Sequence, residues 1–188
     1  MKIAYVDYND VNNSIDGTTI SVWVQGCPHR CKGCHNPETW DFDSEKVFCT
    51  LNNEKEHNNF LKENISEKIN LNNIKRNVSI LGGEPLATQN EYFTFKLIHY
   101  VRKRFPGHKI YLWTGYSMKE IKEKYKNYPY LLNELYYVDY IITDRFHLDE
   151  RNVELKLRGS SNQHIWTSKR TLFGRKFIDI TKDIDNRK

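Results

Sequence analysis

Three of the four cysteines fall within eight residues, as Cys27, Cys31 and Cys34 in a C-x3-C-x2-C spacing. Three thiolates on one short loop can converge on a single metal centre. Iron–sulfur cubanes are held by cysteine thiolates, usually four. A set of three leaves one iron open to bind a small molecule, as catalytic metal sites require. The spacing therefore predicts a cluster site in which these cysteines are both the metal ligands and the catalytic groups.

A zinc site is the alternative, with His29 or His35 as the fourth ligand. Zinc sites usually combine two paired ligand motifs separated by a spacer. No second Cys or His pair follows at such a spacing. The spacing favours the cluster, and a zinc-stabilised binding module remains the second hypothesis. Cys49 stands alone in a polar stretch and is interpreted as a bystander thiol.

Strands alternate with helices through the middle of the chain. Runs rich in β-branched and aromatic residues predict strands over Ile3–Tyr8, Thr19–Val24, Val78–Leu81, Lys109–Thr114 and Val138–Thr143. Apolar residues at helical spacing predict helices bearing Leu61, Ile65 and Ile69, then Phe93, Leu97, Val101 and Phe105, then Met118, Ile121 and Tyr125. Asn90 is expected to cap the second helix, and Ser117 with Glu120 forms a capping box for the third.

This alternation predicts a parallel sheet with right-handed crossovers. In such sheets functional groups collect at the carboxyl ends of the strands. The cysteine loop, the turn Gly82-Gly83-Glu84-Pro85, Thr114 and Asp144 all follow predicted strands. We therefore expect them to meet at one edge, although the turn alone would suit an ordinary tight connection and Asp144 could simply end its strand.

The composition indicates a globular protein. The chain has 188 residues, of which 38% are hydrophobic, and no apolar run approaches the roughly 20 residues of a membrane span. The net charge of +5 is modest and spread along the chain, so we expect no direct nucleic-acid or membrane binding. The polar N-terminus and the clustered thiols favour a cytoplasmic protein.

Several blocks, in this order, resemble the radical S-adenosylmethionine superfamily and, within it, the activating proteins of anaerobic ribonucleoside-triphosphate reductases. The blocks are Gly26-Cys27-Pro28-His29-Arg30-Cys31-Lys32-Gly33-Cys34-His35-Asn36-Pro37-Glu38-Thr39-Trp40, Gly82-Gly83-Glu84-Pro85, Leu112-Trp113-Thr114-Gly115-Tyr116 and Arg158-Gly159-Ser160-Ser161-Asn162-Gln163. The resemblance covers about Asp7 to Gln163. His35 stands where relatives often have an aromatic residue such as Tyr, and the basic tail after Gln163 has no counterpart.

The resemblance implies a [4Fe-4S] cluster on Cys27, Cys31 and Cys34, with S-adenosylmethionine chelating the fourth iron. One electron would then break the sulfonium C–S bond to give methionine and a 5′-deoxyadenosyl radical. The turn at Gly82, Gly83 and Glu84 would serve the methionine end. Further contacts are expected at the adenine side, from Gly33, Cys34 and His35, and at the ribose, from Thr114 and Asp144.

The implied target is a glycine Cα–H of the large subunit of the reductase, on which a glycyl radical forms. A small molecule or another glycyl radical enzyme is the alternative target. Reduced flavodoxin or ferredoxin would suit a basic surface as electron donor. An eight-stranded barrel usually needs about 250 residues, so the expected fold is α/β: one domain over residues 1–188, forming an incomplete (open) radical-SAM type β/α barrel with a mostly parallel sheet. Residues 164–188 form a basic tail with no predicted structure.

Overall fold

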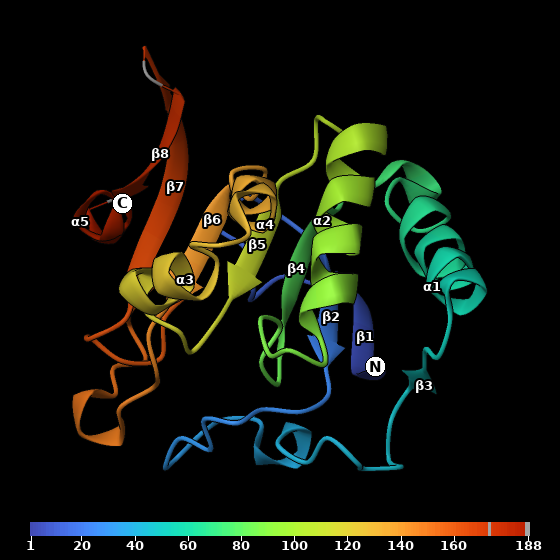
Figure 1. The fold of residues 1–188 in the computed structure, drawn as a ribbon, viewed down its shortest axis with the longest axis horizontal. Coiled ribbons are helices and arrows are strands. Elements are labelled where there is room, and N and C mark those ends of the chain that lie inside the picture. The colour runs from blue at the N-terminus through green and yellow to red at the C-terminus, as the bar shows by residue number, and fades with distance from the viewer. Residues whose placement is uncertain (173, 187–188) are drawn as a thin grey trace.

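The computed structural model describes residues 1–172 and 174–186, in which eight strands form one open sheet (Figure 1). The strand order is β3-β1-β2-β4-β5-β6-β7-β8. The strands span Lys2–Asp10 (β1), Thr19–Val24 (β2), Cys49–Thr50 (β3), Asn77–Gly82 (β4), Ile110–Trp113 (β5), Tyr140–Thr143 (β6), His164–Thr171 (β7) and Gly174–Asp179 (β8).

The four central strands are parallel, as the sequence predicts. β2 pairs with β4, β4 with β5 and β5 with β6, which aligns Val22, Ile80 and Leu112 across the sheet. The outer pairings are antiparallel on both sides. The prediction of a mostly parallel sheet therefore holds at the centre and fails at the edges. The reason is the connections: within the described residues, no crossover helix of the length a parallel pair requires separates β1 from β2, β6 from β7 or β7 from β8.

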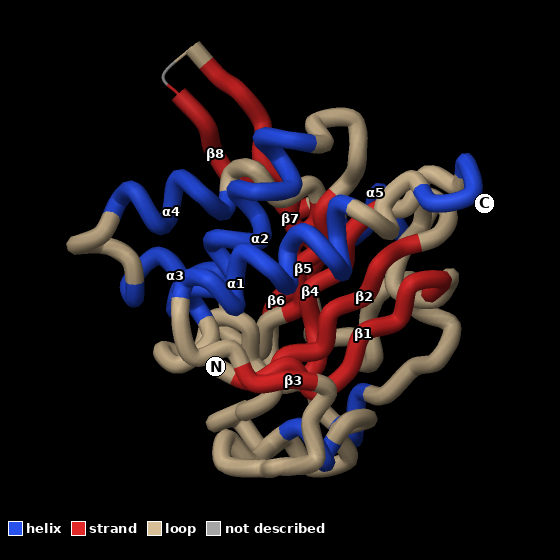
Figure 2. Tube along the Cα trace, turned by 90° about the vertical axis from the view of Figure 1, so that its right-hand side faces the viewer, coloured by secondary structure: helices blue, strands red, loops and turns tan. Residues whose placement is uncertain are grey.

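Four helices cover one face of the sheet, and a fifth lies on the other (Figure 2). They span Glu54–Phe60 (α1), Glu91–Arg104 (α2), Met118–Lys124 (α3), Pro129–Leu135 (α4) and Thr181–Asp185 (α5). The π-helical turn Leu61–Ser66 extends α1, and short 3-10 turns occur at Pro37–Thr39, Leu71–Asn73 and Leu148–Glu150.

The residues of β5 alternate between two apolar clusters, as a strand with a period of two requires. Ile110 and Leu112 belong to the larger core beneath α1 to α4. Tyr111 belongs to a smaller cluster with Ile165 and with Ile184 of α5. Both faces of the sheet centre are thus covered, which leaves the strand ends as the open edge.

The predicted helices are present. Leu61, Ile65 and Ile69 are all fully buried, and Ser117 and Glu120 form the expected capping box of α3. The predicted cap at Asn90 is wrong. Asn90 precedes α2, but its side chain makes no capping bond and donates instead to the carbonyls of Gln25, Gly26 and Glu84.

The residues after Gln163, for which no structure was predicted, form β7, β8 and α5. Positions 173, 187 and 188 of that tail lie outside the described residues. α5 is tied back to the body because Asp185 accepts a bond of 2.5 Å from Arg158. Because Ile165 and Ile184 are fully buried, this segment completes the smaller core.

No helix in the described residues is long and apolar enough to cross a membrane.

A buried carboxylate fixes the loop between β1 and β2. Asp10 is only 6% exposed and accepts bonds from the side chains of Ser21 and Asn13 and from the backbone N–H groups of Asn12 and Asn13. Burial raises the pKa of Asp10, but the hydrogen bonds outweigh burial, so the net pKa lies below the ordinary value of an aspartate.

We predict that Asp10→Asn lowers the free energy of unfolding at pH 7 by about 1–3 kcal/mol, since bonds to a buried charge are lost. The folded pKa is lowered, so this contribution is present above the unfolded value near 4 and disappears as pH falls through the folded pKa. The difference between variant and wild type should therefore shrink in acid. Urea unfolding between pH 7 and pH 3 measures it.

Asp7→Asn is the matched control, because Asp7 accepts a single exposed bond from the N–H of Asn9. It should change stability by less than about 0.5 kcal/mol. A stability difference between Asp10→Asn and the wild type that stays constant down to pH 3 would contradict the lowered pKa of Asp10.

Candidate functional site

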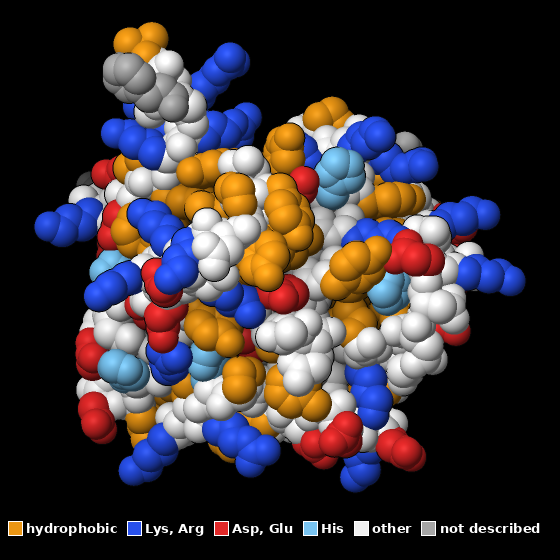
Figure 3. Space-filling model, viewed as in Figure 1, with side chains coloured by type: hydrophobic (Ala, Val, Ile, Leu, Met, Phe, Trp, Pro, Cys, Tyr) orange, Lys and Arg blue, Asp and Glu red, His pale blue; other side chains and the backbone are white. Residues whose placement is uncertain are grey.

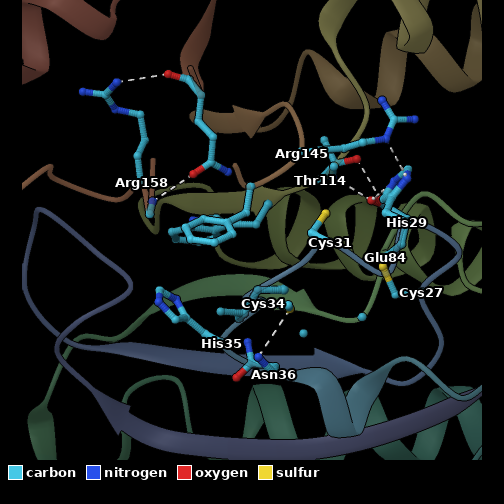
Figure 4. A pocket seen from close by; sticks show the side chains of 18 of the residues that line it. Cys27, His29, Cys31, Cys34, His35, Asn36, Glu84, Thr114, Arg145 and Arg158 are labelled. Atoms are coloured by element: carbon cyan, nitrogen blue, oxygen red, sulfur yellow. Dashed lines mark hydrogen bonds and ion pairs between the residues drawn. The ribbon is translucent and has the colours of Figure 1, made fainter. Parts of the chain in front are cut away.

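The carboxyl ends of the central strands surround a cavity of about 350 Å³. Its lining comes from the cysteine loop, the end of β4, the end of β5, the segment after β6, and residues 155–159. Figure 4 shows Cys27, His29, Glu84 and Arg145 at one end of this cavity, with His35 and Arg158 toward the other. The functional groups predicted to meet at the carboxyl ends of the strands therefore lie at that edge of the sheet.

Of the residues predicted for the site, all but one line the cavity: Cys27, Cys31, Cys34, His35, Gly82, Gly83, Glu84, Thr114 and Asp144. Gly33 does not contribute to the lining. It is exposed on the outer side of the loop, against Leu148 of the 3-10 turn after β6. Its predicted role at the adenine stays a prediction.

The cysteine loop is anchored at its base by backbone hydrogen bonds. Gly26 N–H donates to Thr39 at 2.8 Å and Cys27 N–H donates to Trp40 at 3.0 Å. Within the loop, Cys34 N–H donates to the carbonyl of Cys31 at 3.0 Å. The loop thus returns on itself and presents its thiols to the cavity.

Burial opposes ionisation of the Cys27 and Cys31 thiols. It raises the pKa of Cys27 to about 11, with a further increase from the Glu84 carboxylate. Burial also raises the pKa of Cys31, although the Arg145 guanidinium opposes that increase. Since thiolates are the metal-binding form, metal binding here must release protons.

In the described residues the three thiols do not form a site for a single metal ion. Among the described residues, no three Cys, His, Asp or Glu side chains converge closely enough to hold a metal ion. Tetrahedral zinc with bonds of 2.3 Å places its sulfur ligands about 3.8 Å apart. A cubane binds each thiolate through a different iron, so three sulfurs around one cavity suit it without meeting at a point.

His29 does not fit the role of fourth zinc ligand, since both its ring nitrogens have protein partners. Nε2 lies 3.0 Å from Glu84 Oε2, and Nδ1 lies 3.2 Å from Arg145 Nε. His35 is exposed, and its ring packs at 5.5 Å from that of Phe146. The donor set therefore fits an iron–sulfur cluster better than the zinc alternative.

The Gly82–Pro85 turn is joined directly to the base of the cysteine loop. Gly83 N–H donates to Val24 at 2.7 Å, and Glu84 N–H donates to Gly26 at 2.8 Å. A Cβ on Gly83 would lie 2.4 Å from the carbonyl oxygen of Gly26, so only glycine allows this approach. The turn and the loop therefore form one unit.

The carboxylate of Glu84 is 1% exposed and accepts four hydrogen bonds. Oε1 accepts from Leu86 N–H at 2.8 Å and from Thr114 Oγ1 at 2.7 Å. Oε2 accepts from Gly115 N–H at 2.7 Å and faces His29 at 3.0 Å. The charge is therefore stabilised within the protein, and Thr114 is one of the groups that stabilise it.

Asp144 follows β6 in a left-handed conformation, with φ of +78°. Its Oδ2 accepts from Thr143 Oγ1 at 2.7 Å and lies 3.0 Å from His164 Nδ1. The Arg158–Gln163 block supports the same segment: Asn162 donates to the carbonyl of Arg145, and Gln163 to that of Asp144. This block positions the lining after β6.

Sequence reasoning missed Arg145 and Phe146. Arg145 bridges His29 and Glu120, and Phe146 gives the cavity an aromatic wall beside His35. Their place directly after Asp144, at a strand end, is the signal that could have identified them.

The chain resembles known proteins over most of its length. Residues 15–166 match a family model described as a 4Fe-4S single cluster domain. The anaerobic ribonucleoside-triphosphate reductase-activating protein of Enterobacteria phage T4 is 34% identical over 81% of this chain and 85% of its own length. The proteins of that name from Escherichia coli K12 and Haemophilus influenzae are 33% and 29% identical, over 78% and 86% of this chain and 86% and 96% of their own.

We predict that iodoacetamide alkylates Cys27 of the iron-free protein about tenfold more slowly at pH 7 than a thiol of pKa 9, because burial raises its pKa to about 11 and the higher nucleophilicity of a more basic thiolate offsets part of its lower population. Its rate should still increase at pH 10, where the reference thiol levels off. Peptide mass spectrometry after timed quenching measures both. A rate for Cys27 that levels off near pH 9 would contradict the prediction.

Proposed function

The chain belongs to the family of anaerobic ribonucleoside-triphosphate reductase-activating proteins, and from this we propose that it generates a glycyl radical on such a reductase. One observation carries the proposal: three cysteines of a 4Fe-4S domain share a cavity with the Gly-Gly-Glu-Pro turn. The names of the relatives supply the partner, an anaerobic ribonucleoside-triphosphate reductase, and we assign the contact to its large subunit.

The family model supports an iron–sulfur cluster in this chain. We assign it to Cys27, Cys31 and Cys34, with S-adenosylmethionine as the second cofactor. Together they supply, when bound, the one-electron cleavage of a sulfonium C–S bond that yields a radical able to take hydrogen from glycine. The protein's own contribution is position, electrostatics and exclusion of water.

The methionine end of the cofactor is assigned to the Gly82–Pro85 turn. Its ammonium needs hydrogen-bond acceptors. Glu84 already receives four hydrogen bonds, so we assign the ammonium to backbone carbonyls of the turn. Glu84 then acts through position and through the negative charge that it keeps beside the site.

The remaining contacts stay as the sequence predicted them, with His35 and Gly33 at the adenine side and Asp144 and Thr114 at the ribose. The wall formed by the rings of His35 and Phe146 supports an adenine at that end. Thr114 Oγ1 already donates to Glu84, so its oxygen is left to act as an acceptor.

The open sheet, with parallel central strands and functional loops at their carboxyl ends, is compatible with the incomplete radical-SAM type barrel. We keep that fold assignment as part of the proposal. A cytoplasmic location belongs to it as well, because an accessible iron site requires a reducing compartment.

We predict that Cys31→Ala, purified without oxygen and reconstituted with iron and sulfide, releases no 5′-deoxyadenosine from S-adenosylmethionine. Removing one of three ligands leaves the cluster without its anchorage. The glycyl doublet in electron paramagnetic resonance (EPR) spectra of mixtures with the cognate reductase should vanish too. Chromatography and EPR measure the two losses separately.

Cys49→Ala is the matched control and should retain both activities, because Cys49 lies in β3 against the core, away from the cavity. Cleavage by the wild type without a glycyl doublet would indicate another target. A colourless wild-type preparation that contains zinc would support the binding-module alternative.

The electron donor must approach the cluster loop, where Arg30 and Lys32 are exposed on either side of Cys31. We propose that these two cations receive an acidic donor such as reduced flavodoxin or ferredoxin. More Lys and Arg side chains surround the β7–β8 hairpin (Figure 3). β7 begins beside Thr143, and the hairpin runs from there away from the edge of the sheet that holds the cavity. The hairpin is therefore too remote to serve cluster reduction.

We predict that Arg30→Glu with Lys32→Glu slows cluster reduction by flavodoxin about tenfold at low salt, since opposite charges steer association. Reduction by dithionite should change much less, and the difference should fade near 0.5 M salt. The double variant Lys169→Glu with Lys176→Glu makes the same charge change on the hairpin and should match the wild type. Stopped-flow bleaching of the cluster absorbance measures the reduction rate of the wild type and of both double variants. Equal slowing by both double variants would refute the docking position.

A further inference from the structure

His29 lies midway between Cys27 and Cys31, yet its side chain is directed inward. The residues on either side of it, Pro28 and Arg30, are exposed, whereas the imidazole is only 6% exposed. A polar ring in the middle of a surface loop ordinarily faces solvent. Something in the body of the protein therefore holds this one.

Four residues from three strand ends form a socket around the ring: Glu84 after β4, Gly115 and Tyr116 after β5, and Arg145 after β6. Glu84 Oε2 and Arg145 Nε lie 3.0 and 3.2 Å from the two ring nitrogens. The Tyr116 ring meets the imidazole edge-on at 4.6 Å. His29 and the Glu84 carboxylate join the segment after β4 to those after β5 and β6, which are themselves linked by the N–H of Asp144 donating to the carbonyl of Tyr116 at 3.1 Å.

The floor of the socket requires glycine. A Cβ on Gly115 would lie 2.4 Å from Cδ2 of His29. The same Gly115 donates its N–H to Glu84 Oε2 at 2.7 Å. One carboxylate oxygen thus receives the backbone of β5 and the imidazole of the cysteine loop together.

One ring nitrogen of His29 accepts a hydrogen bond and the other donates one. A guanidinium has no acceptor, so Arg145 donates and Nδ1 of His29 accepts. Nε2 therefore carries the hydrogen and donates to Glu84. Arg145 is held in turn by Glu120, whose Oε1 lies 3.0 Å from its Nη2. The loop is bound to a carboxylate on one side and to a fixed cation on the other.

We propose that His29 is a positioning residue that fixes the cysteine loop, and with it Cys27 and Cys31, against the Gly82–Pro85 turn. The inference rests on the proposed function in one respect, that the loop holds a cluster. His29 sets how far the first two ligands lie from the turn that would receive the cofactor. Of the three residues between those ligands, His29 enters the socket, while Pro28 and Arg30 are exposed.

The test compares His29→Ala, His29→Gln and Gly115→Ala with the wild type after anaerobic reconstitution with iron and sulfide. Three quantities are measured: iron retained per chain after gel filtration, the midpoint potential of the cluster, and the change in its EPR spectrum on adding S-adenosylmethionine. None of these depends on glycyl radical formation.

We expect His29→Ala to retain several-fold less iron and to show a weakened spectral response to S-adenosylmethionine. Gly115→Ala should act in the same way, because it displaces an intact His29. His29→Gln should recover part of both properties, since an amide can donate to Glu84 and accept from Arg145. His99→Ala is the control: His99 also lies near a carboxylate, Glu134, but is exposed on α2.

Thermal unfolding of the iron-free variants separates positioning from folding. His29→Ala should lower the melting temperature only slightly, because Glu84 keeps three of its four hydrogen bonds and the ring belongs to neither apolar cluster. Unchanged iron retention, potential and spectra in both His29→Ala and Gly115→Ala would overturn the proposal. A wild type that binds the cluster but forms no glycyl radical would refute the proposed function and leave this comparison intact.

Discussion

The site is organised by one buried negative charge. An isolated carboxylate in the protein interior carries a desolvation cost that only several well-placed donors can offset. Glu84 satisfies this condition with donors from its own turn, from the end of β5 and from the cysteine loop. If any of these segments shifted, a charge that water cannot reach would lose a partner. The arrangement of the strand ends is therefore a consequence of stabilising this carboxylate.

Asn90 also links neighbouring strand ends, through hydrogen bonds from its amide to backbone carbonyls. Its amide donates to the carbonyls of Gln25, Gly26 and Glu84, which belong to the ends of two neighbouring strands. Buried carbonyls in such turns have no ladder partner, so they need a side-chain donor. This explains why a residue in capping position leaves the cap unmade. The carbonyls of Gly26 and Glu84 also accept from the N–H groups of Glu84 and Ala87, so the Asn90 amide adds a second donor to them and ties both to Gln25.

The sequence predicted the elements and the gathering of their ends, but not these partners. The β2 strand Thr19–Val24 was predicted to the residue because its β-branched run ends abruptly at Gln25-Gly26. Glu84 and His29 are 55 residues apart, and spacing along the chain carries no signal for such a pair. The edge strands β7 and β8 were not predicted for another reason. β7 and β8 carry exposed Lys and Arg instead of an apolar alternation, and charges of this kind protect sheet edges.

The charges of Glu84 and Arg145 act on different cysteines of the loop. Without iron, burial and Glu84 both raise the pKa of Cys27 and oppose its thiolate. Iron would remove that opposition by supplying positive charge at the sulfur atom, as metals do when they deprotonate a coordinating thiol. Arg145 lies on the opposite side of His29 from Glu84 and favours the thiolate of Cys31. The two proposed ligands therefore have neighbours of opposite charge, Glu84 at Cys27 and Arg145 at Cys31. The His29 ring lies between these two charges and sets their separation.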